Sequence, residues 1–462
     1  MSSTNSSAGK RIEALLDEKS FVEIGAAVTA RATDFNLKPA DTPSDGVVTG
    51  YGTISGKPVY VYSQDAAVLG GSIGEMHAMK ICNLYDLAMK TGTPVVGLID
   101  STGVRLQEST DALNALGSVF FKAAMAKGVV PQISAVFGNC GGGLSLVPAM
   151  SDFVFMEEKN GHLFVNSPNA LDGNYAEKND TSAAKFQSEE AGNVQFVGDA
   201  DTICEKIRAL IDMIPQNNDD VAIADTQDDL NRVIPDLAGA AGDTSILLSN
   251  IADDNDFLEV GEKYAKCLVT GFIRLDGQTI GCVANRSEIV GDDGKVTKLD
   301  GVICADGCRK ATEFVYFCDS FGIPILTVTN IKGFKATVAS EREIAKAAAD
   351  LTAAFANCDV PRVNLIVGKA YGSAYVMMNS KGIGADMTFA WDSAEIGPMD
   401  AKLAAKVMLD GKSAAEIDEA AKEFAALQNS AASAARHGYV DAVIDPAETR
   451  KHLVYAFEML FV

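Results

Sequence analysis

The pattern of hydrophobic and polar positions occurs twice along the chain. Apolar residues flank a tight glycine turn in residues 48–59 and again in residues 269–280. A Ser-Gly or Asp-Gly turn between two apolar segments is typical of a β-hairpin. Helical spacing of apolar residues follows each hairpin, over residues 74–91 and 308–321. The sequence therefore predicts the same hairpin and helix in both halves of the chain.

Two buried strands complete the pattern in each half, and each strand opens on a proline. In both halves the two prolines have the same separation along the chain. The expected strands are residues 93–99, 130–138, 323–329 and 360–368. Strands alternating with helices predict a parallel sheet, so we expect an α/β fold that arose by internal duplication.

The boundary between the two copies is expected near residue 240, which gives domains of residues 1–240 and 241–462. Residues 215–237 are rich in Asn, Asp, Gln and Pro, a composition typical of a linker. In the second domain, the Ala-rich residues 401–435 predict helices that pack on the domain. Residues 438–462 predict a short strand and a terminal helix.

Charge excludes some classes of partner. The 462 residues include 62 acidic and 39 basic side chains, for a formal charge of -23. A field of that sign repels phosphate backbones and anionic headgroups, so we expect no nucleic-acid partner. No apolar run approaches the roughly 18 residues of a membrane span, and residues 1–10 lack the apolar core of a signal peptide. We therefore expect a cytoplasmic protein.

Cysteine and histidine offer little material for a metal centre. The nine cysteines form no C-x-x-C pair, and the four histidines show neither H-x-x-H nor H-E-x-x-H spacing. We therefore expect no metal site and no histidine-based triad. Cys304 and Cys308 lie about one helical turn apart, and we interpret them as apolar core residues.

Small-residue turns follow the third strand of each half. Residues 138–144 read Gly-Asn-Cys-Gly-Gly-Gly-Leu, residues 368–375 read Gly-Lys-Ala-Tyr-Gly-Ser-Ala-Tyr, and each opens a helix. The first N–H groups of a helix have no partners within it, so such a turn can hold an oxyanion, worth about 3–4 kcal/mol per donor. The alternative is that these glycines serve only close packing. Two oxyanion holes without a nearby base fit carboxyl transfer between biotin and an acyl thioester.

Several motifs in order resemble the carboxyltransferase subunits of biotin-dependent acyl-CoA carboxylases and decarboxylases, of the propionyl-CoA carboxylase β and methylmalonyl-CoA decarboxylase α type. They are residues 100–108, 138–143, 369–375, 378–386 and 389–396. The resemblance runs from Arg11 to the end of the chain. It implies two tandem crotonase-like (ClpP/crotonase) domains, the first on the acyl-CoA side and the second on the biotin side.

The resemblance also implies which residues touch the reactants. On the acyl-CoA side, Gly142 and Gly143 would hold the thioester oxygen. On the biotin side, Gly372, Ser373 and Ala374 would hold the biotin oxygen.

Further substrate contacts are expected on both sides. Val376, which follows Tyr375, falls where the family tunes its acyl pocket. The segment Ser101, Thr102 and Gly103 is the other substrate-binding candidate. Arg105 either meets a CoA phosphate or, with Asp100 and Glu108, forms an acid–base set or an ordinary exposed ion pair at a helix start.

The expected function is carboxyl transfer between carboxybiotin and a short acyl-CoA, in either direction. The acyl-CoA is acetyl- or propionyl-CoA, or malonyl- or methylmalonyl-CoA. The cofactor is biotin on a separate carrier, and the CoA thioester is the substrate. The implied partners are a biotin carboxyl carrier protein and either a biotin carboxylase or a membrane decarboxylase subunit, with the chain itself forming a homohexamer.

Two alternatives remain open. A crotonase-like hydratase or isomerase needs a carboxylate base, and neither glycine turn has Asp or Glu in its next few residues. A catalytically degenerate scaffold subunit is the other alternative, because four segments depart from the family pattern. Ser373 replaces a glycine, and Asn330-Ile331-Lys332-Gly333-Phe334 replaces Asp-Val-Pro-Gly-Phe. Lys346-Ala347-Ala348 replaces Arg-His-Gly, and residues 399–404 replace Met-Gly-Pro-Glu-Gly-Ala.

Overall fold

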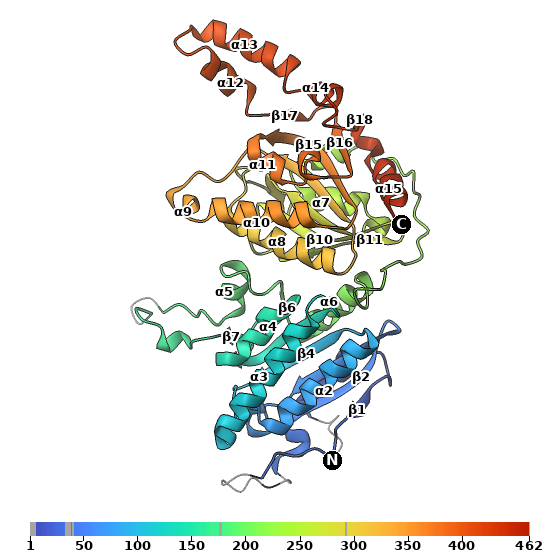
Figure 1. Ribbon diagram of the computed structural model, residues 1–462, viewed down its shortest axis with the longest axis vertical. Helices are drawn as coiled ribbons and strands as arrows, with labels where there is room; N and C mark the ends of the chain where they lie inside the picture. Colours follow the sequence, from blue (N-terminus) through green and yellow to red (C-terminus); the bar gives the residue numbers. More distant parts are fainter. Residues whose placement is uncertain (1–5, 33–37, 39–40, 175–177, 292, 462) are drawn as a thin grey trace. The chain divides into compact units, whose positions relative to one another are not determined.

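The two halves of the chain fold into eight-stranded sheets with the same strand order. The first sheet runs β1-β2-β3-β4-β5-β6-β8, with β7 pairing with β5. The second runs β9-β10-β11-β14-β15-β16-β18, with β17 pairing with β15. Each sheet therefore has an antiparallel edge followed by parallel strands, which confirms the expected α/β fold and its internal duplication (Figure 1).

The structure is a computed structural model that describes residues 6–32, 38, 41–174, 178–291 and 293–461. Half of the polar stretch 1–10 lies outside the described residues. The chain divides into two compact units, Met1–Val221 and Ala222–Val462. Within the described part of the chain, no helix is long and apolar enough to cross a membrane.

Both predicted hairpins are confirmed, together with their turns. β2 (Val47–Ile54) pairs with β3 (Lys57–Gln64), and β10 (Leu268–Leu275) pairs with β11 (Gln278–Asn285). The turn residues Ser55 and Gly56 have φ of 50° and 78°, and the equivalent pair in the second hairpin has 52° and 73°. Two successive positive φ values define a type I′ turn, which matches the twist of the strands it joins.

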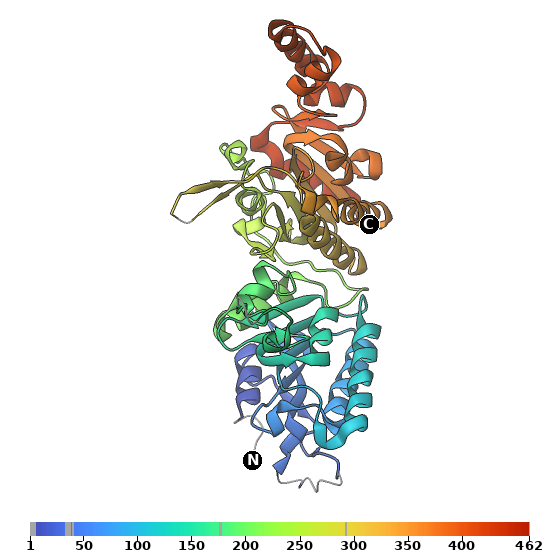
Figure 2. The same ribbon diagram turned by 90° about the vertical axis from the view of Figure 1, so that its left-hand side faces the viewer.

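The sheet of the first unit carries helices on both faces. α2 (Glu75–Thr91) and α3 (Ser109–Ala126) pack together on one face, while α1 (Ser7–Leu15) and α6 (Ala200–Met213) lie on the other (Figure 2). Because both faces are covered, the central strands are buried along nearly their whole length. The other elements of this unit are β1 (Val22–Ile24), β4 (Val95–Ser101), β5 (Gln132–Gly141), α4 (Leu146–Met150), β6 (Phe153–Glu157), β7 (His162–Phe164), α5 (Ala184–Glu189) and β8 (Phe196–Gly198).

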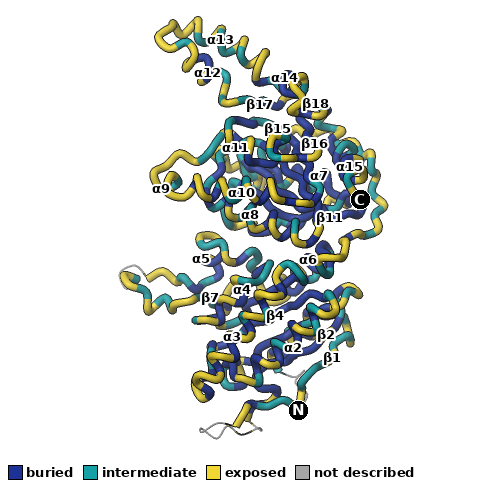
Figure 3. The backbone as a smooth tube through the Cα atoms, viewed as in Figure 1, coloured by how far each residue is buried: buried dark blue, intermediate teal, exposed yellow. Residues whose placement is uncertain are grey.

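The second unit repeats this arrangement. α8 (Ala305–Ser320) and α10 (Ile344–Asn357) pack side by side, and α7 (Thr244–Ile251) and α15 (Thr449–Leu460) share a core with strands β10, β11, β14 and β15. The dark-blue sheet in Figure 3 marks this core. The remaining elements are β9 (Phe257–Val260), β12 (Glu288–Val290), β13 (Val296–Lys298), β14 (Ile325–Ile331), α9 (Val338–Glu341), β15 (Arg362–Tyr371), α11 (Gly372–Met377), β16 (Met387–Trp391), β17 (Glu395–Gly397) and β18 (Ala442–Ile444).

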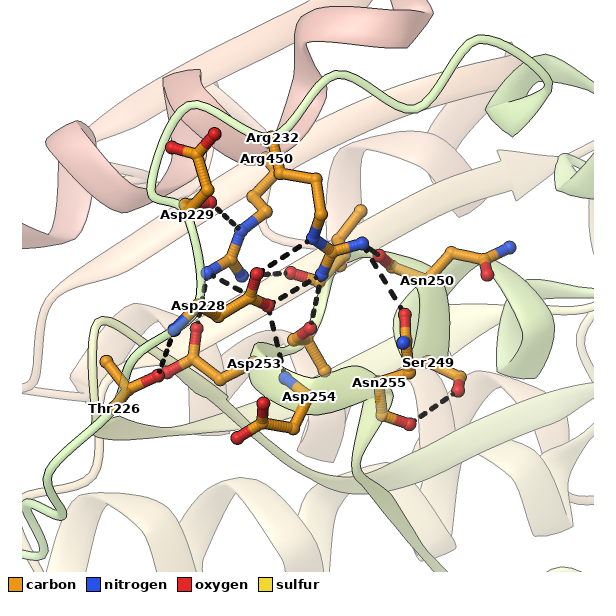
Figure 4. Close-up of polar contacts among 12 residues, drawn as sticks. Thr226, Asp228, Asp229, Arg232, Ser249, Asn250, Asp253, Asp254, Asn255 and Arg450 are labelled. Atoms are coloured by element: carbon orange, nitrogen blue, oxygen red, sulfur yellow. Dashed lines mark hydrogen bonds and ion pairs between the residues drawn. The ribbon is translucent and has the colours of Figure 1, made fainter.

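Residues 222–240 pack on the second unit, although the sequence pattern assigned them to the first domain. The Ala224 N–H donates to the Gly277 carbonyl at 2.9 Å, and the Leu237 side chain is fully buried. The polar side chains of this segment also have partners within the unit. Figure 4 shows Arg232 bridging to Asp228, whose carboxylate also faces the buried Arg450 of α15.

Arg450 ties the end of the chain to this segment. Its Nη1 donates to the Ile251 carbonyl and its Nη2 to Asp253 Oδ1, both at 2.6 Å (Figure 4). Its Nε donates to the Asp229 carbonyl at 3.1 Å. The Asn- and Asp-rich composition therefore reflects hydrogen bonding to buried partners as well as exposure to solvent.

The Ala-rich tail forms helices as predicted, but two of them do not pack on the sheet. α12 (Ala401–Met408) packs against α13 (Ala414–Leu427), and α13 has no buried residue. The pair extends away from the sheet of its unit and is largely exposed (Figures 1 and 3). Only α14 (Ala431–Arg436) packs as expected. The strand and helix expected in residues 438–462 are confirmed as β18 and α15.

Candidate functional site

A cavity of about 480 Å³ lies in the second unit, where β15 ends and α11 begins. Gly372 makes the turn with a φ of 61°, and a Cβ on it would lie 3.3 Å from the Pro398 carbonyl oxygen. The positive φ favours glycine, and the close approach leaves little room for a side chain. The residues lining the cavity are Lys332, Gly333, Phe334, Lys369, Tyr371, Gly372, Ser373, Ala374, Pro398, Met399, Asp400 and Leu403. The structure thus brings the predicted Gly372, Ser373 and Ala374 to one cavity.

Segments that depart from the family pattern form two of its walls. Lys332 comes from the loop after β14, where the pattern expects proline. Met399, Asp400 and Leu403 come from the start of α12. Three of the four departures, at Ser373, residues 330–334 and residues 399–404, therefore reach the cavity, whereas residues 346–348 lie on α10.

A charged network supports the turn from one side. Lys369 and Tyr371 lie two positions apart on β15, and both side chains contact the Glu395 carboxylate of β17. Burial alone would raise the pKa of Glu395, but the hydrogen bonds from Lys369 and Tyr371 hold that pKa below its usual value. Burial, together with the hydrogen bond to Glu395, raises the pKa of Tyr371. The sequence analysis missed this network, although the spacing of two on a strand indicates a shared face.

Asp400 adds a carboxylate that the glycine turns lack. Its Oδ1 accepts hydrogen bonds from the Lys402 and Leu403 N–H groups at 3.0 and 3.2 Å, so it caps α12. Asp400 lines the cavity although it lies 28 positions after Gly372 in the sequence. No local motif could have indicated this approach, because the fold alone brings the two segments together.

The first unit presents the equivalent turn where β5 ends. Gly141 pairs with β7 as Tyr371 pairs with β17, so Gly142 is the counterpart of Gly372. The φ of Gly142 is 64°, close to that of Gly372. Gly143, like its counterpart Ser373, is exposed. A Cβ on Gly143 would lie 3.5 Å from Leu116 Cδ2, an ordinary contact, so the space beside this turn is open.

In each unit a polar side chain from the neighbouring strand, β4 or β14, packs against a glycine just before the turn. The Asp100 carboxylate occupies the space that a Cβ on Gly138 would need, and Asn330 Oδ1 occupies the equivalent space at Gly368. Asn330 Oδ1 also accepts the Lys369 N–H at 3.0 Å. Strand pairing places Asp100 and Asn330 at equivalent positions, so both halves use the same device.

The predicted segment Ser101, Thr102 and Gly103 lies beside the turn of the first unit. Ser101 pairs with Cys140 on β5, and its Oγ accepts the Gly103 N–H at 3.1 Å. Gly103 has a φ of 97°, and a Cβ on it would lie 3.5 Å from the Gly141 carbonyl oxygen. Ser101 and Gly103 therefore lie beside the end of β5, next to the turn at Gly142.

Arg105 lies in the interior of the first unit, not in an exposed ion pair at a helix start. Its side chain is fully buried, with Nη1 2.6 Å from Asp45 Oδ1 and 2.9 Å from Glu108 Oε1. The pair with Glu108 is present but enclosed, and burial raises the pKa of Asp45. Asp100 pairs with Arg11 instead, at 2.7 Å. A guanidinium enclosed by two carboxylates is not placed to meet a CoA phosphate.

Val376 and Tyr375 lie on α11 outside the cavity lining. Val376 is 42% exposed. Tyr375 packs against the small core that includes Ile366 and Ala390, and burial raises its pKa to about 12. Among the residues that the structure describes, no group of three or more His, Cys, Asp or Glu side chains is placed to hold a metal ion.

Comparison with known proteins gives a consistent result over the whole chain. The carboxyl transferase domain family matches residues 3–461. The propionyl-CoA carboxylase beta chain of Roseobacter denitrificans is 39% identical, over 98% of this chain and 90% of the relative. The methylmalonyl-CoA decarboxylase subunit alpha of Propionigenium modestum is 38% identical with the same coverage. The transcarboxylase 12S crystal structure, a hexamer with hydrolyzed methylmalonyl-coenzyme A bound, matches with a TM-score of 0.91 and 35% identity over 99% of this chain and 90% of its own.

Proposed function

Because this chain belongs to the carboxyl transferase domain family, we propose that it transfers a carboxyl group between carboxybiotin and a short acyl-CoA. One observation carries the proposal: the chain has two equivalent glycine turns, and the second opens on a cavity of about 480 Å³. A volume in that range is typical of a small-molecule site. Each turn would hold one of the two oxygens that gain charge during transfer.

The residues of the second unit fit biotin on the evidence of the cavity itself. Gly372 has no side chain to block the cavity at the start of α11, and Phe334, Met399 and Leu403 provide apolar walls. When bound, biotin supplies the carboxyl group and a ureido nitrogen that can take up a proton. The N–H groups of Ser373 and Ala374 would donate to the ureido oxygen. Glu395, held between Lys369 and Tyr371, would keep the strand end rigid.

The first unit would bind the thioester. Gly142 and Gly143 would donate to the thioester oxygen and so stabilise the enolate that forms at the α-carbon. Ser101 and Gly103 would line the approach to the same oxygen. The proposed acyl groups are acetyl and propionyl, or malonyl and methylmalonyl in the reverse direction, in keeping with the names of the relatives.

The proposed partners follow from this chemistry. Biotin would arrive on a separate biotin carboxyl carrier protein, charged by a biotin carboxylase or discharged through a membrane decarboxylase subunit. A homohexamer is the proposed assembly, supported by the hexamer of the transcarboxylase 12S structure. The proposed compartment is the cytoplasm, supported by nine cysteines that are all free.

A single assay separates the competing functions. The purified protein is incubated with malonyl-CoA or methylmalonyl-CoA and free biotin, and carboxybiotin and the decarboxylated acyl-CoA are measured. Formation of both products in equal amounts is the expected result. Parallel incubation with an enoyl-CoA tests for hydration, which Asp400 would have to support as the base. Hydration without carboxybiotin would overturn the proposal in favour of a hydratase, and no reaction with either substrate would favour a scaffold.

A further inference from the structure

Two cysteines of the second unit are in contact, although they lie far apart in the sequence. Cys267 Sγ, just before β10, lies 3.5 Å from Cys304 Sγ, the N-cap of α8. Both residues are partly exposed. The sequence had paired Cys304 with Cys308 one helical turn later, whereas Cys308 is fully buried in the core.

The surroundings of Cys304 favour its thiolate. Its Sγ accepts the Gly307 N–H at 3.4 Å, at the positive end of a 16-residue helix. The contact with the Cys267 sulfur and that N–H together lower the pKa of Cys304 against the opposing effect of burial, and the charge of Lys335 acts in the same direction as the two contacts. The pKa of Cys267 is raised, chiefly by its hydrogen bond to Cys304. Cys304 is therefore the sulfur expected to react first, and Cys267 the sulfur expected to react second.

Comparison of the two halves shows that this pair is a local replacement. In the first unit Lys80 donates to the Val47 carbonyl, and in the second Lys310 donates to the Leu268 carbonyl in the same way. Counting back from these contacts, Gly46 and Gly74 occupy the places of Cys267 and Cys304. The space that a Cβ on Gly74 would need is filled by the buried Arg105 and Glu108 side chains. The first unit has an enclosed ion cluster where the second has two thiols.

We propose that Cys267 and Cys304 are a peroxide-sensitive dithiol that forms a disulfide, and that this disulfide acts on the loop of residues 332–335, which contributes to the cavity lining. The Cys304 thiolate attacks one oxygen of hydrogen peroxide, the O–O bond breaks, and hydroxide leaves, which gives a sulfenic acid. Cys267 Sγ then attacks the sulfenic sulfur, the S–S bond forms, and the S–O bond breaks. The Cys267 proton leaves with that oxygen as water. The two thiols are oxidised by two electrons and the peroxide is reduced.

The disulfide would act on the cavity through two backbone hydrogen bonds. The Ile303 N–H donates to the Gly333 carbonyl at 3.0 Å, and the Lys335 N–H donates to the Ile303 carbonyl at 2.9 Å. Gly333 and Phe334 line the cavity. Shortening the sulfur contact to a covalent bond moves Cys304, and the adjoining Ile303 carries the displacement to this loop.

The test uses the full-length protein and peptide mass spectrometry after treatment with hydrogen peroxide. We expect a peptide cross-linked between Cys267 and Cys304 that disappears on reduction with a dithiol. Cys82 is an internal control, because it is also partly exposed but burial raises its pKa to about 11. It should stay reduced. Failure to find the cross-link, or a cross-link from Cys304 to Cys308, would overturn the proposal.

Two variants and one dynamic measurement test the order of events and the coupling. With Cys267→Ser the sulfenic acid on Cys304 should persist and be trapped by dimedone, whereas with Cys304→Ser no label should appear on Cys267. Labelling of Cys267 in the second variant would contradict the assigned roles. Hydrogen exchange of residues 332–335 should differ between the oxidised and reduced proteins, and identical exchange would refute the coupling. None of these readouts depends on carboxyl transfer, so they test the dithiol independently of the proposed function.

Discussion

Filling the turn of the first unit is the most direct test of the proposed oxyanion holes. In Gly143→Val a branched side chain would occupy the open space beside Gly142. Gly143 has no positive φ, and its Cβ would meet only Leu116 and Phe120 at 3.5 and 3.9 Å, so the fold should accept the change. Loss of one oxyanion donor costs about 3–4 kcal/mol at the transition state, which lowers kcat by roughly 100- to 1,000-fold. Because the contact matters mainly in the transition state, KM should change little.

The assay is steady-state carboxyl transfer from malonyl-CoA or methylmalonyl-CoA to biotin, with the unfolding midpoint measured on the same samples. Gly143→Ala should give an intermediate loss, since its methyl group fills less of the space. Gly239→Val is the matched control, because Gly239 is exposed, has no positive φ and has nothing within 4 Å of its Cβ position. Unchanged turnover in Gly143→Val, with an intact fold, would refute the role of this turn.

Three further outcomes are expected. Val376→Asp should fold normally, because the site is 42% exposed. If Val376 lines the acyl pocket, as the resemblance implies, the variant should change the ratio of acetyl- to propionyl-CoA rates, since one methylene is worth about 1–3 kcal/mol in a pocket. An unchanged ratio would remove Val376 from the acyl site. Arg450→Met leaves Asp253 buried without its partner, so the free energy of unfolding measured in urea should fall by about 3–5 kcal/mol. The control Arg342→Met changes an exposed residue and should lower it by less than about 0.5 kcal/mol. Burial and Arg105 hold the pKa of His77 at about 3, below its usual 6.5, so stability present above pH 6.5 should fall as the pH drops towards 3, by up to about 1.4 kcal/mol per pH unit. Urea midpoints across this range should decline less steeply in His77→Gln.

The repeat was predictable from the sequence because hairpin turns and buried strands follow local rules. Type I′ turns at Ser55-Gly56 and Asp276-Gly277 depend on two adjacent residues, and the pattern identified both. The start of the second unit was not predictable in this way. Residues 222–240 look like a linker by composition, and only contacts with distant partners such as Ala447 and Arg450 show that they are packed.

In the candidate site, too, local motifs were predictable from the sequence, whereas residues brought in by long-range contacts were not. The glycine turns were visible as motifs, and their equivalence followed from the repeat. Asp400 and Glu395 were not visible, because their approach to the cavity depends on how β17 and α12 return to the end of β15. Arg105 was expected on the surface because its burial depends on Asp45, which is 60 positions away in the sequence.

The seating of Asp100 on Gly138 and of Asn330 on Gly368 has a consequence for the history of the duplicated chain. A side chain at either glycine would collide with the polar group seated on it, so neither glycine can change without a matching change in the preceding strand. The seated side chain, by contrast, differs between the copies, an acid at position 100 and an amide at position 330. Mutational drift would then be slow at the joints between strands and fast in the loops that those joints carry. Substitutions in the lining of one half can therefore accumulate while the joint between strand and turn in both halves stays unchanged.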